Sequence, residues 1–133
     1  MALKITLKPQ ERMIVGGAVL RNGSSGSCHL IIENRVPVLR QRDIMGEAEA
    51  STLIRRLYFT IQLIYIDQQT PEPHLAAYWH LAKMLLSEDP QQAALVNRIS
   101  GEIVAGRYYP ALKLASKLVN MEQKGDRYAG ASE

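Results

Sequence analysis

Hydrophobic and polar residues alternate along the beginning of the chain. Leu3, Ile5 and Leu7 alternate with polar side chains, a period of two that predicts a strand with one buried and one solvated face. Pro9 lacks an amide proton and has a fixed φ, so we expect a turn directly after this strand. The apolar, β-branched run at residues 13–15 predicts a second strand.

Two consecutive glycines follow this second strand. Gly16 and Gly17 permit a bulge, a sharp bend or a close backbone approach that a Cβ atom would forbid. Residues 18–20 resume the strand pattern, and the turn-forming sequence at residues 21–23 ends it. We therefore expect three short strands within residues 3–23, with basic side chains along their solvated side.

A less regular stretch completes the strand-rich part. Residues 24–27 are small and polar, as in a flexible linker or a hairpin tip. Residues 28–33 predict a fourth strand. Residues 36–39 are extended, but Pro37 confines them to an edge or a bulge because it cannot donate to a ladder. These segments together predict a small antiparallel β module over residues 1–46.

The hydrophobic period then changes from two to about 3.6 residues, which predicts a helix over residues 47–67. Its apolar stripe consists of Leu53, Leu57, Ile61 and Ile64. Glu47 and Glu49 fall in the first turn, where carboxylates favour the helix dipole. The β-branched and aromatic residues also permit a buried strand. We prefer a helix because the run is long and because Arg55 and Arg56 stand opposite the stripe.

Two further helices are predicted by their end signals. Thr70 is an expected N-cap, with two prolines following in the first turn of a helix that reaches about Ser87. Asp89 and Gln92 form a capping-box pattern at the start of the next helix. Gly106 is an expected left-handed cap at the end of that helix.

A last helix is predicted to begin at residues 108–110, and residues 125–133 show no pattern. The sequence thus predicts an α+β protein. Its expected parts are a basic antiparallel β module at 1–46, a bundle of about four helices at 47–124 and a flexible tail at 125–133.

Composition indicates a folded protein: 47% of its 133 residues are hydrophobic and 22% are charged. No apolar run approaches the ~20 residues that a membrane span needs. Lys4 and Lys8 interrupt the apolar positions that a signal peptide would require. Cys28 is the single cysteine, which suits a reducing compartment. We expect a cytoplasmic protein without a membrane partner.

Positive charge is concentrated in the β module. The net charge is +3, but residues 1–46 carry seven basic and three acidic residues. The basic residues there are Lys4, Lys8, Arg12, Arg21, Arg35, Arg40 and Arg42. A polyanion such as a nucleic acid would neutralise them and release counterions. The alternative is that they solvate strand faces and guard sheet edges.

The residue types of known catalytic sites do not occur together. His29, His74 and His80 are far apart in sequence and lack metal-ligand spacing. Cys28 has no nucleophile motif around it, and the glycine pair is not followed by the remaining residues of a phosphate loop. We expect a binding protein rather than an enzyme, with no metal and no cofactor.

Four segments of the chain form a recognisable set: ALKITLKPQERMIVGGAVLRNG, IENRVPVLRQRDIM, LIRRLYFTIQLIYID and ALKLASKLV. Over residues 2–122 they resemble the FlbT family of alphaproteobacterial flagellin regulators. Within these segments, the combination of LKP-x-E-R, GGAV-x-RNG and VPVLR is specific. The opening strands, the turn with Glu11 and the run ending in Gly16 are also similar to the carbon-storage-regulator (CsrA) proteins, small β-rich dimers that bind messenger RNA leaders. A strand-exchanged homodimer would follow from that similarity.

The FlbT resemblance implies a post-transcriptional repressor in flagellum biogenesis. Such proteins associate with the 5′ untranslated region of flagellin messenger RNA, promote its decay and are opposed by a small activator, FlaF. On this hypothesis the seven basic residues contact RNA, and Gly16 and Gly17 shape the bend that aligns them. Residues 1–46 contain no aromatic residue for base stacking. Direct recognition would therefore rely on arginine planes and backbone groups, or the effect on RNA would be indirect.

The alternative is a protein-binding adaptor or chaperone-like regulator that binds flagellin or the FlaF-type activator. The helical half contains aromatic residues of the kind that anchor interfaces, and they can equally complete the helical core. These residues are Tyr58, Tyr65, Tyr78, Trp79, Tyr108 and Tyr109.

Overall fold

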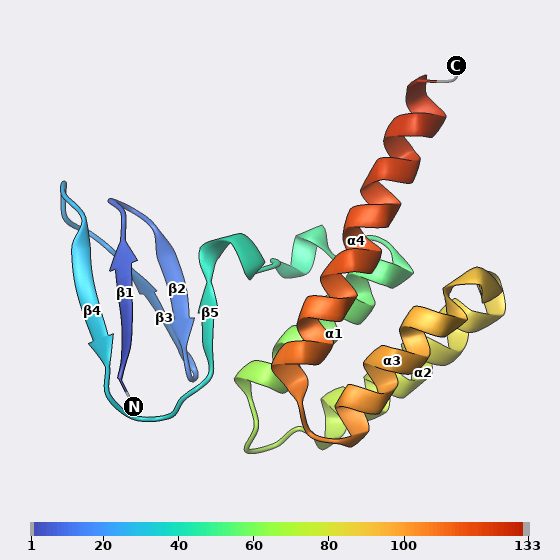
Figure 1. Ribbon diagram of the computed structural model, residues 1–133, viewed down its shortest axis with the longest axis horizontal. Helices are drawn as coiled ribbons and strands as arrows, with labels where there is room; N and C mark the ends of the chain where they lie inside the picture. Colours follow the sequence, from blue (N-terminus) through green and yellow to red (C-terminus); the bar gives the residue numbers. More distant parts are fainter. Residues whose placement is uncertain (1, 132–133) are drawn as a thin grey trace. The chain divides into compact units, whose positions relative to one another are not determined.

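The computed structural model describes the backbone of residues 2–131 and the side chains of residues 2–125. The chain divides into two compact units, Met1–Ile44 and Met45–Glu133, here called the strand unit and the helical unit. Within the described residues, all five strands belong to the first unit and all four α-helices to the second (Figure 1). The α+β fold expected from the sequence, with small antiparallel strands before a helical half, is confirmed.

Two small antiparallel sheets make up the strand unit. Strand β1 (Leu3–Leu7) pairs with β4 (Cys28–Ile32), with Leu3 opposite Ile32 at one end and Leu7 opposite Cys28 at the other. The second sheet has the order β3 (Ala18–Arg21), β2 (Arg12–Val15), β5 (Val38–Arg40).

The two sheets pack their apolar faces together. Ile5, Leu7 and Met13 form the buried centre of this core. The residues packed against it are Val15, Cys28, Leu30, Ile32 and Val38. The period of two along β1 directs Ile5 and Leu7 inward and leaves Lys4 and Thr6 exposed, as predicted.

Gly16 and Gly17 form the two-residue turn between β2 and β3. Gly16 has φ +59°, and its amide donates to the carbonyl of Pro37 at 2.8 Å. A Cβ atom at Gly16 would lie 3.1 Å from Cγ2 of Val36, whereas one at Gly17 would meet nothing within 4 Å. Gly16 at the first central position fits a type II′ hairpin turn. Of the two glycines, the geometry requires the first.

Asn22 organises the loop after β3. Its buried side-chain amide donates to the carbonyls of Leu7 at 3.0 Å and Gly26 at 2.9 Å. Its Oδ1 accepts from the backbone amide of Ser24 at 3.0 Å. Ser24 Oγ also donates to Asn22 Oδ1 and lies within bonding distance of the Gly26 carbonyl, both at 2.7 Å, so the side chains of Asn22 and Ser24 together order this loop.

The first helix begins later than predicted. Residues 47–49 form a short 3-10 turn, and helix α1 spans Leu53–Ile66. Thr52 has an extended backbone, and its Oγ1 accepts from the amide of Arg55 at 3.1 Å, which makes it the N-cap. Glu49 accepts from the amide of Gly46 in the preceding turn, so neither glutamate lies in the first turn of α1.

The start of the second helix is also corrected. Helix α2 spans Glu72–Glu88, with Pro71 at its N-cap position. Thr70 lies one residue before that position, and its hydroxyl and amide donate to the carboxylate of Asp67, at 2.9 and 3.3 Å. Thr70 therefore stabilises the turn after α1 rather than the start of α2.

The third and fourth helices largely follow the sequence signals. A 3-10 turn at Pro90–Gln92 leads into α3 (Ala93–Val104). The Asp89 carboxylate accepts from the Gln92 side chain at 3.1 Å, but neither side chain caps a backbone amide. Gly106 has φ +76°, which confirms the left-handed position, and α4 spans Tyr108–Ala131. Residues 132–133 lie outside the described residues, and the flexibility expected over 125–133 stays a prediction.

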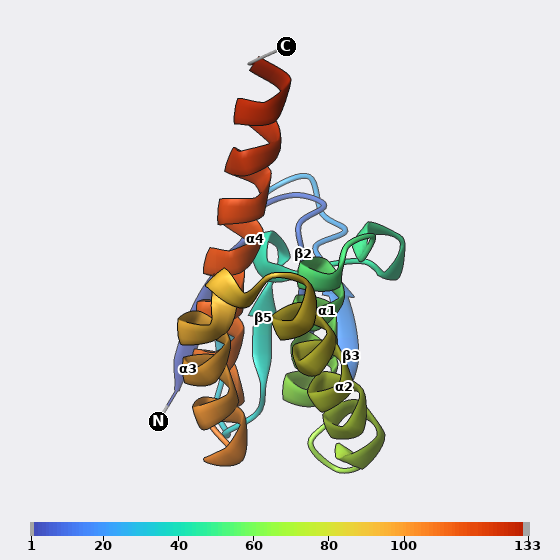
Figure 2. The ribbon, with the colours of Figure 1, turned by 90° about the vertical axis from the view of Figure 1, so that its right-hand side faces the viewer.

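Within the helical unit, α1 packs against α2 and α4, and α4 also packs against α3 (Figure 2). The predicted stripe of α1 is buried at Leu57, Ile61 and Ile64. The other buried residues include Tyr78, Leu85, Val96, Ile99, Ile103, Leu112, Ala115 and Leu118. Across the described helices, none combines the length and apolar character that crossing a membrane would require.

Candidate nucleic-acid interface

Two of the seven predicted RNA-binding residues oppose each other directly. Arg12 on β2 and Arg21 on β3 are cross-strand partners, so their side chains share one face with Cβ atoms about 5 Å apart. Both side chains are exposed, and neither guanidinium has a partner among the described residues. Like charges directly opposite destabilise a sheet, and an anion between them removes the repulsion.

The glycine turn creates this pairing. A two-residue turn joins Val15 to Ala18, and counting back along both strands places Arg12 opposite Arg21. Because turn length sets hairpin register, a turn one residue longer would separate the two arginines. The turn at Gly16 and Gly17 therefore sets which residues of β2 and β3 oppose each other, and the alignment of basic residues for RNA stays a prediction.

A tight turn carrying Lys8 lies beside the arginine pair. The Glu11 amide donates to the Lys8 carbonyl at 3.0 Å, and the Glu11 carboxylate accepts from the Lys8 amide at 2.9 Å. Asn22, next to Arg21, accepts from the Gln10 amide at 2.8 Å and donates its own amide to the Glu11 carbonyl at 3.0 Å. The turn is therefore tied to the end of β3. We call Lys8, Arg12 and Arg21 the basic end.

Arg40 makes structural contacts within the strand unit. Its guanidinium donates to the carbonyl of Thr6 at 3.1 Å and lies 3.7 Å from the Glu11 carboxylate. It lies opposite Met13 on β2, so it shares the core-side face of that sheet. Arg40 therefore joins β5 to β1 and offsets the charge of Glu11.

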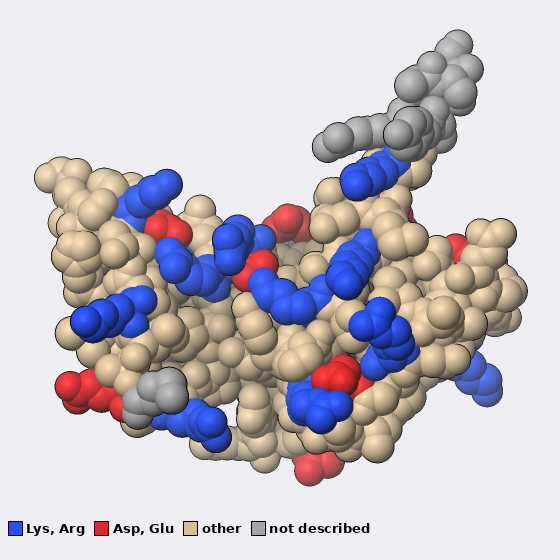
Figure 3. All heavy atoms as spheres, in the orientation of Figure 1, with Lys and Arg blue, Asp and Glu red and all other residues tan. Residues whose placement is uncertain are grey.

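The other basic residues lie elsewhere on the strand unit. Lys4 is on the outer face of the β1–β4 sheet, and Arg42 is 81% exposed, 3.8 Å from the Asp43 carboxylate. Figure 3 shows Lys and Arg atoms over the strands, with Asp and Glu atoms among them. The structure thus brings three of the seven candidates together.

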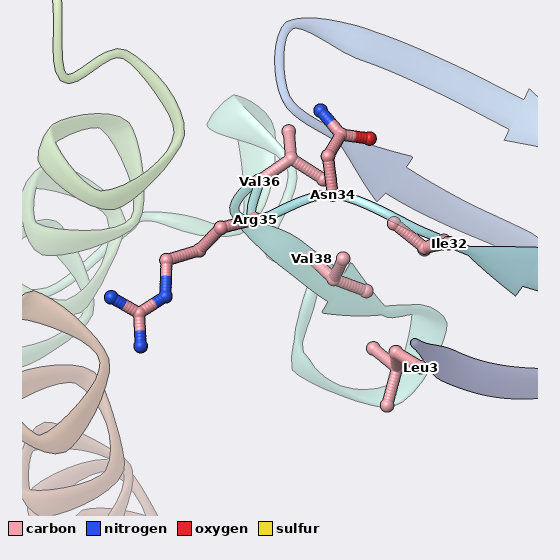
Figure 4. Close-up of a pocket in the computed structure, with 6 residues that line it drawn as sticks. All are labelled: Leu3, Ile32, Asn34, Arg35, Val36 and Val38. Carbon is pink, nitrogen blue, oxygen red and sulfur yellow. The ribbon is translucent and has the colours of Figure 1, made fainter. Parts of the chain in front are cut away.

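Arg35 borders an apolar pocket of about 430 Å³. The pocket is lined by Leu3, Ile32, Asn34, Arg35, Val36 and Val38 (Figure 4). Arg35 extends away from Leu3, Ile32 and Val38, so the rest of the lining consists of four aliphatic side chains and Asn34. A pocket with this lining suits an apolar group rather than a phosphate.

A second pocket, of about 360 Å³, lies at the basic end. It is lined by Lys8, Pro9, Gln10, Glu11 and Gln41. Gln41 accepts from the Arg12 amide at 2.7 Å through Oε1, and Gln10 has φ +66°. Neither glutamine stands out in the sequence, because no local signal marks a left-handed glutamine or a side chain contacting a distant strand.

The six aromatic candidates for partner binding have different environments. Tyr58 and Tyr78 are buried in the core. The Tyr78 hydroxyl pairs with Ser100 Oγ at 2.8 Å, and burial raises the pKa of this phenol. Trp79 is 43% exposed, with its ring edge-on to Tyr78 at 5.0 Å between centroids.

The remaining aromatics gather near the start of α4. The ring centroids of Tyr65 and Tyr109 are 5.5 Å apart, and Lys113 Nζ lies 5.1 Å from the centroid of the Tyr109 ring. Tyr108 is half-buried, whereas Tyr109 is exposed. Of these six residues, Trp79 and Tyr109 are the exposed ones.

An ion pair joins α3 to the start of α4. The Arg107 guanidinium donates to the Glu102 carboxylate at 2.8 and 2.9 Å, which holds the pKa of that carboxyl below its ordinary range.

In the part of the chain with described side chains, no three His, Cys, Asp or Glu residues are grouped as a metal ion would require.

Comparison with known proteins gives a consistent result. The model of a family described as "Flagellar protein FlbT" matches residues 3–125. The chain is 37% identical to the probable flagellum biosynthesis repressor protein FlbT 1 of Bradyrhizobium diazoefficiens, over 93% of this chain and 84% of that protein. It is 31% identical to the flagellum biosynthesis repressor protein FlbT of Caulobacter vibrioides, over 93% and 89%. A probable repressor of the same name from Caulobacter sp. K31 is 33% identical, over 93% and 95%. No solved structure matches the chain.

Proposed function

Because the chain belongs to the FlbT family of flagellar proteins, we propose that it represses flagellum biosynthesis by binding messenger RNA through its basic end. The relatives are named repressors of flagellum biosynthesis, and the motifs LKP-x-E-R, GGAV-x-RNG and VPVLR lie inside the matched region. The proposed RNA is the 5′ untranslated leader of a flagellin messenger. Its decay is proposed to be the work of cellular nucleases.

The observation that carries this proposal is the pairing of Arg12 with Arg21 across β2 and β3. Two exposed arginines held opposite each other repel, so the sheet keeps them at an energetic cost that a bound phosphate offsets. Lys8 adds a third cation on the adjoining turn. The absence of aromatic residues from residues 1–46 favours phosphate contacts over base stacking.

The test is equilibrium binding of a flagellin leader RNA over a salt series, comparing wild type with an Arg12→Ala/Arg21→Ala variant. We expect the variant to bind more weakly. The slope of log K against log salt should decrease by about 1.4, since each lost phosphate contact on a single strand contributes about 0.7.

The matched control is a Lys4→Ala/Arg42→Ala variant, which removes the same charge from exposed positions outside the basic end. Its binding should remain closer to wild type. If both variants lose the same RNA affinity, the effect is explained by net charge alone. If the protein binds the leader and a scrambled RNA equally well, direct readout of the leader sequence is excluded.

Protein binding by the helical unit is a second candidate, favoured by the exposure of Trp79. Its ring is fixed edge-on against Tyr78 and is 43% exposed, a state suited to an interface anchor. Because the chain has one tryptophan, its fluorescence can be followed while flagellin or a FlaF-type activator is added. A saturable change in Trp79 fluorescence would support this function. Calorimetry should then show that Trp79→Ala loses affinity for the same partner.

A further inference from the structure

We propose that the pocket between the turn at residues 8–11 and Gln41 binds one unpaired adenine, read by the side-chain amides of Gln10 and Gln41. The inference rests on the proposed RNA-binding function and assigns to it a base contact beside the phosphate contacts. The pocket is linked to the arginine pair through the backbone, because its lining residue Gln41 accepts from the amide of Arg12.

The backbone at Gln10 is the first argument. Pro9 and Gln10 occupy the central positions of a turn closed by the bond from the Glu11 amide to the Lys8 carbonyl. With φ +66° at Gln10, this is a type II geometry, whose second central position normally holds glycine or asparagine. A glutamine in a left-handed conformation is strained, and such strain concentrates where a side chain is used.

The hydrogen-bonding capacity of the two amides is the second argument. Within the described residues, the Gln10 side chain has no partner, since its contacts are made by its backbone. Gln41 uses Oε1 for the Arg12 amide, which leaves its NH₂ group as a donor. A glutamine amide pairs with adenine through one donor and one acceptor, at N7 and N6. On the same edge guanine offers two acceptors, which would place its O6 against the amide oxygen.

The remaining lining is compatible with a base. Pro9 contributes an apolar ring face. The carboxylate of Glu11 is engaged with the Lys8 amide and lies 3.7 Å from Arg40, so its charge is offset. Lys8 lines the pocket, where a phosphate beside the base would lie.

Gln10→Gly separates the function of the side chain from its structural cost. Glycine adopts the left-handed conformation without strain, so this variant should unfold at a higher temperature than wild type. The probes are a dodecamer of uridine and three dodecamers with one central adenine, guanine or cytosine, measured by fluorescence anisotropy at low salt. Wild type should bind the adenine dodecamer about tenfold more tightly than the uridine dodecamer, the effect of one bidentate amide–base pair.

Gln10→Gly should bind all four RNAs with equal affinity and keep the salt sensitivity of wild type. Ser25→Gly, which removes an exposed polar side chain from another loop of the strand unit, should keep the adenine preference. Equal wild-type affinities, preference for another base, or adenine preference retained in Gln10→Gly would overturn the pocket assignment alone. Absence of salt-sensitive binding to every RNA would instead overturn the proposed function.

Discussion

Asn22 shows how one side chain can satisfy several backbone groups in a small unit. The residue is buried, and its amide bridges the end of β1 and the loop at residues 23–27 through Leu7 and Gly26. Its backbone amide and carbonyl contact the turn that carries Lys8. A change here therefore acts on both the strand core and the basic end.

Replacing Asn22 by aspartate should destabilise the protein by about 2–3 kcal/mol. The new carboxylate oxygen would face the carbonyls of Leu7 and Gly26, which need a donor. Urea unfolding followed by circular dichroism measures the loss. Asn34→Asp, the same change at an exposed position of the same unit, should stay within about 0.5 kcal/mol of wild type. Equal effects of the two substitutions would assign the loss to charge rather than to the buried bonds.

At the scale of elements, the hairpin of β2 and β3 determines which basic residues meet. Its register depends on a turn of two residues, and Gly16 in that turn also donates to Pro37 beside β5. The turn thus positions the arginine pair at one end of the hairpin while its other end contacts the segment before β5. The two glycines are not equivalent, and this difference can be measured.

Gly16→Ala should lower the free energy of unfolding by about 1–2 kcal/mol, because alanine is strained at positive φ. Its Cβ atom would also lie 3.1 Å from Val36. Gly17→Ala should be within about 0.5 kcal/mol of wild type, since that Cβ atom would meet open space. Thermal or urea unfolding of the two variants side by side provides the comparison. An equal cost at both positions would show that the turn differs from the one described.

At the scale of the whole molecule, charge is unevenly divided along the sequence. Residues 1–46 have a net charge of +4, and the rest of the chain is close to neutral. A long-range field of this kind accelerates association with a polyanion, whereas local geometry governs how long the complex lasts.

Rates of RNA binding should therefore distinguish the two double variants. Arg12→Ala/Arg21→Ala and Lys4→Ala/Arg42→Ala each remove two positive charges from the strand unit. Both should slow association to a similar degree, and only the first should speed dissociation, because it removes the opposed pair. Stopped-flow fluorescence with a labelled leader RNA measures both rates. Faster dissociation of the second variant as well would contradict a localised interface.

Local sequence rules were reliable where one residue or a short repeat decides the outcome. The alternation of Ile5 and Leu7 with Lys4 and Thr6 predicted β1, and Gly106 was recognised as a left-handed position. The start of α1 was predicted too early, since Thr52 rather than the region of Glu47 supplies the cap. Several residues have the polarity of an N-terminal cap, and the position at which the backbone enters the helix selects among them, as Pro71 rather than Thr70 precedes α2.

By itself, the sequence determined the α+β fold class, the strand and helix patterns, the basic character of the first third and the FlbT family, because each depends on residue type and local order. Tertiary structure alone decided that Arg12 opposes Arg21 and that Arg40 is engaged with Thr6. It also decided that Gln10 and Gln41 border one pocket. These relations join residues distant in sequence, and they depend on strand register and turn geometry, which residue types do not specify.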